Sequence, residues 1–150
     1  MRSKSNKNAM LGPDDLTVEV LRAAFDSCCV TTGLNDRGEL ILTEGPGCVC
    51  WVLPMEDYKI IHYRKLLLLP SDIDLSAGLE MSNRINAFPM IKAHARNVQT
   101  GDGDTGVGLI FIYDAYTGGG VSIEYIVQCY RWFVFYVNEA LQQVVGVSSR

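Results

Sequence analysis

The feature that most constrains this 150-residue sequence is a long apolar segment near its C-terminal end. From Ser122 to Gln143 or Val145 the apolar residues recur at helical spacing. Ser122 is a good N-cap, and Glu124 falls in the first turn, where a carboxylate interacts favourably with the helix dipole. The helix is apolar nearly all round, and such a helix is usually buried on more than one side.

This helix carries more apolar surface than one core face requires. One stripe consists of Ile123, Ile126, Val127, Tyr130, Phe133, Val134, Val137 and Leu141, and other apolar residues lie elsewhere around the helix: Tyr125, Cys129, Trp132, Tyr136 and Ala140. Exposed aromatic surface usually marks an interface. We therefore predict a protein interface at Tyr125, Cys129, Trp132 and Tyr136, for a second copy of the chain or for another protein. Coverage of both faces within the monomer, for instance by the first helix, is the alternative.

Charge and hydropathy exclude several classes of protein. The net charge of −4, with 13 Lys and Arg, argues against nucleic-acid binding, which needs a basic face. The most apolar segment contains Glu124, Gln128 and Arg131, so it is too polar for a membrane span. The first ten residues are polar and basic, and no apolar signal core follows them. We predict a cytoplasmic protein that contacts neither nucleic acid nor membrane.

The rest of the chain alternates irregularly between predicted strands and helices. The expected elements are a helix over 15–28 capped by Asp14 or Asp15, strands over 29–34, 39–44, 48–53 and 59–68, a helix opening at Ser71 or Asp72 and closing at Phe88-Pro89, strands over 91–99 and 106–116, and the long helix. The 48–53 segment is apolar on both faces, so it should be a central strand. This order (α-β-β-β-β-α-β-β-α) predicts an α+β fold with a mainly antiparallel sheet and three helices. We expect a single domain over 14–145, a disordered tail over 1–13 and a flexible C-terminus over 146–150.

The residues that carry catalytic or metal chemistry elsewhere do not form a recognisable pattern here. The five cysteines are Cys28, Cys29, Cys48, Cys50 and Cys129. Their number is odd, their surroundings are apolar and they lack C-x-x-C spacing, so we expect reduced and mostly buried thiols without a metal. His62 and His94 lie in predicted strands outside any catalytic motif, so we interpret them as structural. We predict no enzymatic activity and no cofactor.

Two loops and one pair of asparagines can each be interpreted as structural or as functional. Asp102-Gly103-Asp104 lacks the remaining ligands of a calcium loop, so we predict a solvated hairpin tip. The loop before the long helix has free N–H groups that could hold an anion, although it has no Walker lysine. Gly118, Gly119, Gly120 and Ser122 are therefore the candidate residues of an alternative function, a small-ligand or anion sensor. Asn83 and Asn86 are expected to satisfy backbone groups at a helix end.

With these elements placed, the chain resembles the YbjN family of candidate bacterial sensory transduction regulators. The matching stretches, between about 14 and 143, are 16–21, 35–40, 83–86, the strand from Ile91, 109–113 and 119–122. The family is similar to the type III secretion chaperone fold, an often dimeric α+β domain that binds protein segments and has no established catalytic residues. The resemblance implies a non-enzymatic, chaperone-like or regulatory protein that binds itself and another protein. Cys48-Val49-Cys50-Trp51 departs from the acidic early strands of the family, which leaves the choice of partner open.

Overall fold

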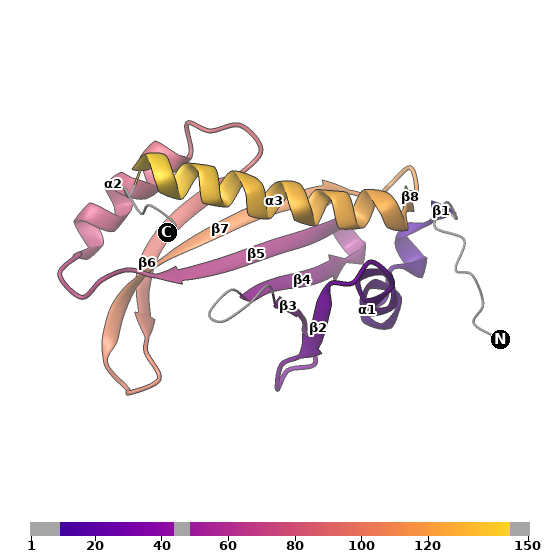
Figure 1. Cartoon of the computed structure of the whole chain (residues 1–150), viewed down its shortest axis with the longest axis horizontal. Helices are drawn as coiled ribbons and strands as arrows, with labels where there is room; N and C mark the ends of the chain where they lie inside the picture. The colour runs from indigo at the N-terminus through magenta and orange to yellow at the C-terminus, as the bar shows by residue number, and fades with distance from the viewer. Residues whose placement is uncertain (1–9, 44–48, 145–150) are drawn as a thin grey trace. The chain divides into compact units, whose positions relative to one another are not determined.

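The computed structural model of the protein describes residues 10–43 and 49–144, and Figure 1 shows the arrangement of its elements. The elements are β1 (Met10–Leu11), the 3₁₀ turn η1 (Pro13–Asp15), α1 (Val18–Ser27), β2 (Thr31–Leu34), β3 (Leu40–Thr43), β4 (Val49–Met55), the 3₁₀ turn η2 (Glu56–Tyr58), β5 (Ile60–Leu68), α2 (Leu75–Ile85), β6 (Lys92–Gln99), β7 (Thr105–Tyr116), β8 (Val121–Ser122) and α3 (Ile123–Val144). Within the described ranges, three α-helices accompany an antiparallel sheet, so the predicted α+β fold is confirmed.

The larger sheet has six strands in the order β2-β3-β4-β5-β7-β6. β4 lies between β3 and β5, as its apolar sequence predicted, and its Cys50 pairs with Leu42 of β3. β6 and β7 form an antiparallel hairpin in which His94 pairs with Ile110. The hairpin loop begins at Thr100, whose N–H donates to the carbonyl of Asp104 over 2.8 Å, as the loop composition predicted.

Two helices begin later than the sequence predicted. α1 is capped by Thr17, whose hydroxyl accepts from the N–H of Val20 at 3.3 Å. Asp14 and Asp15 belong instead to η1, which Pro13 starts. α2 is capped by Asp74, whose carboxylate accepts from the N–H of Ala77 at 2.8 Å. The prediction of Ser71 or Asp72 as this cap was wrong because residues 70–73 form a turn, closed by the N–H of Ile73 on the carbonyl of Pro70 at 3.0 Å.

The described part of the N-terminal segment begins with a short strand at Met10. Met10 and Leu11 form β1, which pairs with Ser122 and Val121 of β8 in a separate two-stranded sheet. The predicted disordered tail was therefore wrong for residues 10–13. Its earlier residues, and the predicted flexible stretch 146–150, lie outside the described residues. A two-residue strand is too short for its alternation to be recognised in the sequence.

The chain divides into two compact units. The first consists of Met1–Tyr63 and Asp114–Trp132, and the second of Arg64–Tyr113 and Phe133–Arg150. β5, β7 and α3 each continue from one unit into the other, so neither unit is a contiguous piece of sequence. The predicted single domain stays a prediction.

Aromatic packing and alternating strand residues build the core of the first unit. Phe25 of α1 and Tyr130 of α3 meet edge to face, with ring centroids 5.6 Å apart. The buried hydroxyl of Tyr63 donates to the carbonyl of Ile126 at 2.9 Å, which satisfies the one polar atom of this side chain. In β4, Cys50 and Val52 point into the core, while the intervening residues are half-buried.

The core of the second unit depends on a close approach of α2 to the β6–β7 hairpin. Gly78 is buried in the middle of α2, and a Cβ built on it would lie 2.8 Å from a methyl group of Val107 and 3.2 Å from the Cβ of Ala95. A glycine is needed here because any side chain would push the helix away from the strands. Leu109 and Phe111 of β7 are fully buried in the same unit.

Candidate protein-binding surface

In the first unit, α3 leaves large aromatic side chains in solvent. Tyr125 is 38% exposed and Trp132 is 43% exposed. The buried face of this part of the helix is formed by Ile126, Val127, Cys129 and Tyr130. Tyr125 and Trp132 are separated by about two helical turns and so lie on the same side of α3. The monomer therefore does not enclose the helix at these positions.

Cys129 does not belong to this surface. Its side chain is fully buried, so its predicted place in the interface was wrong. Helical spacing put Cys129 beside Tyr125, but this position lies at the border of the buried face, where a small side chain fits into the core. Burial raises the pKa of the Tyr125 phenol, and Cys129, which hydrogen-bonds to it, adds to the rise.

In the second unit, the continuation of α3 carries another pair of aromatic residues. Tyr136, a predicted interface residue, is half-buried. Its ring packs edge to face on Phe135, with centroids 5.4 Å apart. Phe135 is 56% exposed and was not singled out from the sequence. Sequence reasoning missed it because a helix that is apolar all round does not reveal which aromatic side chains the strands cover.

Tyr125 also lines an apolar hollow of about 400 Å³ in the first unit. The other lining residues come from β1, from the end of β7 and from the glycine loop with β8: Met10, Tyr116, Gly119, Gly120, Val121 and Ser122. Met10 and Tyr116 are 64% and 66% exposed. Tyr116 folds against Gly118 so closely that a side chain on this glycine would collide with the ring. We call Met10, Tyr116, Tyr125 and Trp132 the aromatic surface.

The glycine loop that was considered for anion binding forms part of this hollow. Ser122 accepts the N–H of Tyr125 at 3.1 Å, which confirms it as the cap of α3. Gly120 has a φ of 81° and donates its N–H to the carbonyl of Thr117 at 2.9 Å, so this donor is already used. Among the described residues that line the hollow there is no Lys or Arg. These surroundings suit an apolar group better than an anion.

None of the described cysteines and histidines lines the hollow at Tyr125. Cys50 is buried as predicted, whereas Cys29 is exposed at the end of α1 with a φ of 61°, so the expectation of mostly buried thiols was wrong there. Cys48 lies outside the described residues. His62 pairs with Asp114 through Nδ1 and Oδ1 at 2.6 Å, and His94 is exposed on β6. Within 10–43 and 49–144, no three His, Cys, Asp or Glu side chains are grouped so that they could hold a metal ion.

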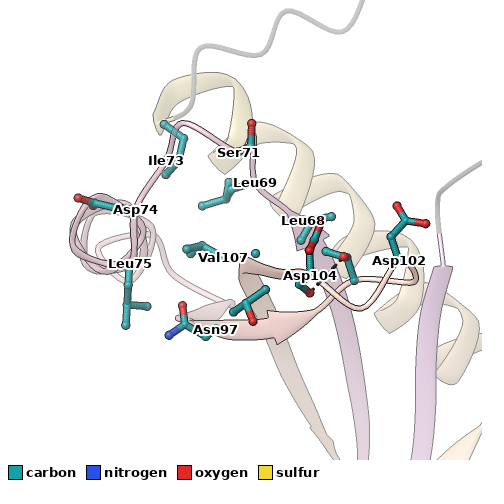
Figure 2. A pocket seen from close by; sticks show the side chains of 13 residues that line it. Leu68, Leu69, Ser71, Ile73, Asp74, Leu75, Asn97, Asp102, Asp104 and Val107 are labelled. Carbon is teal, nitrogen blue, oxygen red and sulfur yellow. Dashed lines mark hydrogen bonds between the residues drawn. The ribbon is translucent and has the colours of Figure 1, made fainter.

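The second unit has its own hollow, of about 750 Å³, between the β6–β7 hairpin and the start of α2 (Figure 2). Its lining includes Leu68, Leu69, Ile73, Leu75, Asn97 and Val107, with Asp74, Asp102 and Asp104 also present. Figure 2 shows Leu69 and Val107 within the hollow, while the carboxylate of Asp74 points away from it. Three separate stretches of sequence supply these residues, so no local motif could have predicted the hollow.

Comparison with known proteins supports the fold and goes no further. No family model matches the chain, and no curated protein matches it. Among solved structures, the chain is similar to YbjN of E. coli, described as a proposed transcription regulator. The two superpose with a TM-score of 0.59 over 87% of this chain and 89% of YbjN, at 16% sequence identity. The resemblance seen in the sequence is thus confirmed at the level of the fold.

Among the described residues, no helix is both long and apolar enough to cross a bilayer.

Proposed function

We propose that this protein is a non-enzymatic protein-binding domain with a regulatory or chaperone-like role, and that it binds through the aromatic surface. One observation carries the proposal. Tyr125 and Trp132 project into solvent from one side of α3, and Tyr125 borders an apolar hollow. Large aromatic side chains in such positions are disproportionately those that dominate the binding energy of protein interfaces.

The apolar hollow and the exposed side chains of the aromatic surface favour a protein partner over a small polar ligand. A partner could insert one apolar side chain beside Met10 and Tyr116 and cover Trp132 with a second. The anion-sensor alternative at Gly118, Gly119, Gly120 and Ser122 has no cation in its support, so we do not favour it.

We propose two partners for the aromatic surface, a second copy of the chain and another protein. Self-association is supported by the exposed side chains of Tyr125 and Trp132, whose apolar surface two copies can bury against each other. A regulatory role is consistent with the fold of YbjN, described as a proposed transcription regulator. The net charge of −4 favours regulation through protein contacts, and we place the protein in the cytoplasm.

Trp132→Glu tests the proposed homodimer. A carboxylate cannot be buried in an apolar interface without a partner, so the dissociation constant of the dimer should rise at least about tenfold. Folding should change little because Trp132 is 43% exposed in the single chain. Light scattering coupled to gel filtration, over concentrations around the micromolar range, measures the mass, and circular dichroism checks the fold.

Asn138→Glu is the matched control, since it adds the same charge at an exposed position on another side of α3. The dissociation constant of its dimer should match that of the wild type. A wild-type chain that stays monomeric at every concentration would remove the homodimer from the proposal. Equal weakening by both variants would show that charge alone, rather than the aromatic surface, governs association.

A further inference from the structure

Within the described residues, β6 hydrogen-bonds to the sheet along one side only. It ends the strand order of this part of the chain, where β7 is its one neighbouring strand. In an antiparallel ladder, every second residue directs both its N–H and its C=O to the same side. Ala93 identifies the outer side, because its N–H donates to the side-chain oxygen of Asn86 at 2.7 Å and its C=O accepts from the side-chain nitrogen at 3.0 Å. Ala95, Asn97 and Gln99 therefore direct their backbone groups outward as well.

The Asn86 amide occupies the place that a neighbouring strand would take, but only at Ala93. Ala95 is nearly buried, whereas Asn97 and Gln99 are exposed. Among the described residues, the outward N–H and C=O groups of Asn97 and Gln99 have no hydrogen-bond partner. β6 also lacks proline, which commonly protects sheet edges. An open stretch of edge thus remains at the hairpin end of β6.

The hollow of the second unit lies beside this open stretch. Asn97 lines it together with Leu69 and Val107, and Figure 2 shows Asn97 on β6 facing the start of α2 across the hollow. Side chains of an added strand alternate between the two faces of a sheet. A strand paired with Asn97 and Gln99 would therefore direct one set of side chains toward the hollow, whose Leu69 and Val107 favour an aliphatic group.

The charge of β6 favours an acidic occupant. Lys92, His94 and Arg96 alternate along the strand and are exposed, and β6 contains no Asp or Glu. Two copies joined through β6 would bring the like charges of Lys92 and Arg96 together, which destabilises an edge-to-edge pair. Asp102 and Asp104 lie beyond Gln99 and Asp74 also lines the hollow, so the carboxylate of an occupant belongs beside Arg96, on the opposite face of the strand from Asn97.

We infer that the outer edge of β6 binds an extended segment of an acidic partner protein by strand addition. The segment pairs with Asn97 and Gln99, places an aliphatic side chain in the hollow and sets a carboxylate beside Arg96. This inference extends the proposed protein-binding function to a second surface. It depends on residues outside the aromatic surface, so the two can fail independently.

A synthetic peptide of alternating glutamate and valine is the probe. Fluorescence anisotropy of the labelled peptide should show saturable binding that weakens as salt is raised. The counterpart with lysine in place of glutamate should bind at least about tenfold more weakly, because it meets Arg96 with like charge. Equal affinity for the two peptides would overturn the acidic partner.

Asn97→Pro and Asn97→Ala separate backbone pairing from side-chain effects. Proline removes the outward N–H, which does not bond to β7, and should weaken the acidic peptide about fivefold or more. Alanine retains the N–H and should bind the peptide within about twofold of the wild type, since the lost side chain is exposed. If both variants bind as the wild type does, the strand-addition mode is wrong.

Hydrogen exchange on the wild-type chain gives a readout that needs no variant. The peptide should slow exchange at the amides of Asn97 and Gln99, whereas Val98, already paired with Gly106, should change little. Absence of protection at Asn97 and Gln99 under saturating peptide would refute the inference. Trp132→Glu should bind the peptide normally, so a failed aromatic surface leaves this result intact. Self-association that Asn97→Pro abolishes would make a second copy the occupant and overturn the acidic partner.

Discussion

The side chain of Asn86 makes the two hydrogen bonds to β6 that the backbone of a neighbouring strand would make. Its sequence position at the end of α2 predicted a role in satisfying that helix end. The structure corrects this, because the amide reaches β6 and bonds both backbone groups of Ala93. A primary amide has one acceptor and paired donors, so it can reproduce the pattern of a neighbouring strand. No local pattern around Asn86 could have predicted a contact with a strand that follows a turn.

Asn86→Ala should lower the free energy of unfolding by about 1–2 kcal/mol, since two hydrogen bonds are lost at a partly buried position. Exchange at the amide of Ala93 should accelerate, because its acceptor is gone. Urea denaturation measures the first effect and hydrogen exchange the second. Asn83→Ala is the control, an exposed asparagine on the same helix, and it should leave both quantities nearly unchanged. Equal effects of the two substitutions would contradict the clamp.

At the scale of elements, the distance between α2 and the β6–β7 hairpin depends on Gly78. Two tendencies oppose each other at Gly78. Alanine is favoured over glycine inside a helix by about 1 kcal/mol. A Cβ here would nevertheless lie 2.8 Å from Val107 and 3.2 Å from Ala95, so the helix or the hairpin must shift. Overpacking of this kind typically costs about 1–3 kcal/mol. The steric cost should win because the obstructing groups are short side chains on strands.

Gly78→Ala is therefore expected to destabilise the protein by about 1 kcal/mol, and Gly78→Val by more. Thermal and urea unfolding provide the measurement. Ser76→Ala is the matched control, since it introduces the same residue at an exposed site of the same helix, and it should be neutral or slightly stabilising. A stabilised Gly78→Ala protein would mean that α2 can retreat from the strands without loss of packing.

The sequence predicted elements better than their ends or their neighbours. Apolar periodicity located α3 and the strands, because burial of one face imposes a repeat on each. The first residues of α1 and α2 were misplaced because several Asp and Thr residues compete as caps, and tertiary contacts select one. On α3 the exposure of Tyr125 and Trp132 was anticipated, whereas the burial of Cys129 was not. Spacing along a helix gives the direction of each side chain around the helix axis, but the elements packed against the helix decide which side chains are buried.

At the scale of the molecule, the α+β class could be derived from element order alone, but neither hollow could. The hollow at Tyr125 needs Met10 beside Ser122, a pairing over a long sequence separation. The hollow at Asn97 needs the turn before α2 beside the β6–β7 hairpin. Such sites arise from contacts between segments that are distant in the sequence, and no local residue pattern predicts these contacts. The open edge of β6 likewise follows from strand order, which the sequence does not state.

The whole chain should not bind duplex DNA, even though YbjN of similar fold is described as a proposed transcription regulator. With 17 acidic against 13 basic residues, the protein repels the phosphate backbone overall. The exposed Lys92 and Arg96 of β6 are too few to supply the several phosphate contacts that stable non-specific binding requires. Anisotropy of a labelled duplex of mixed sequence should therefore stay flat at physiological salt. Binding that weakens steeply as salt rises would contradict this, and Arg96→Glu would then show whether β6 is the site.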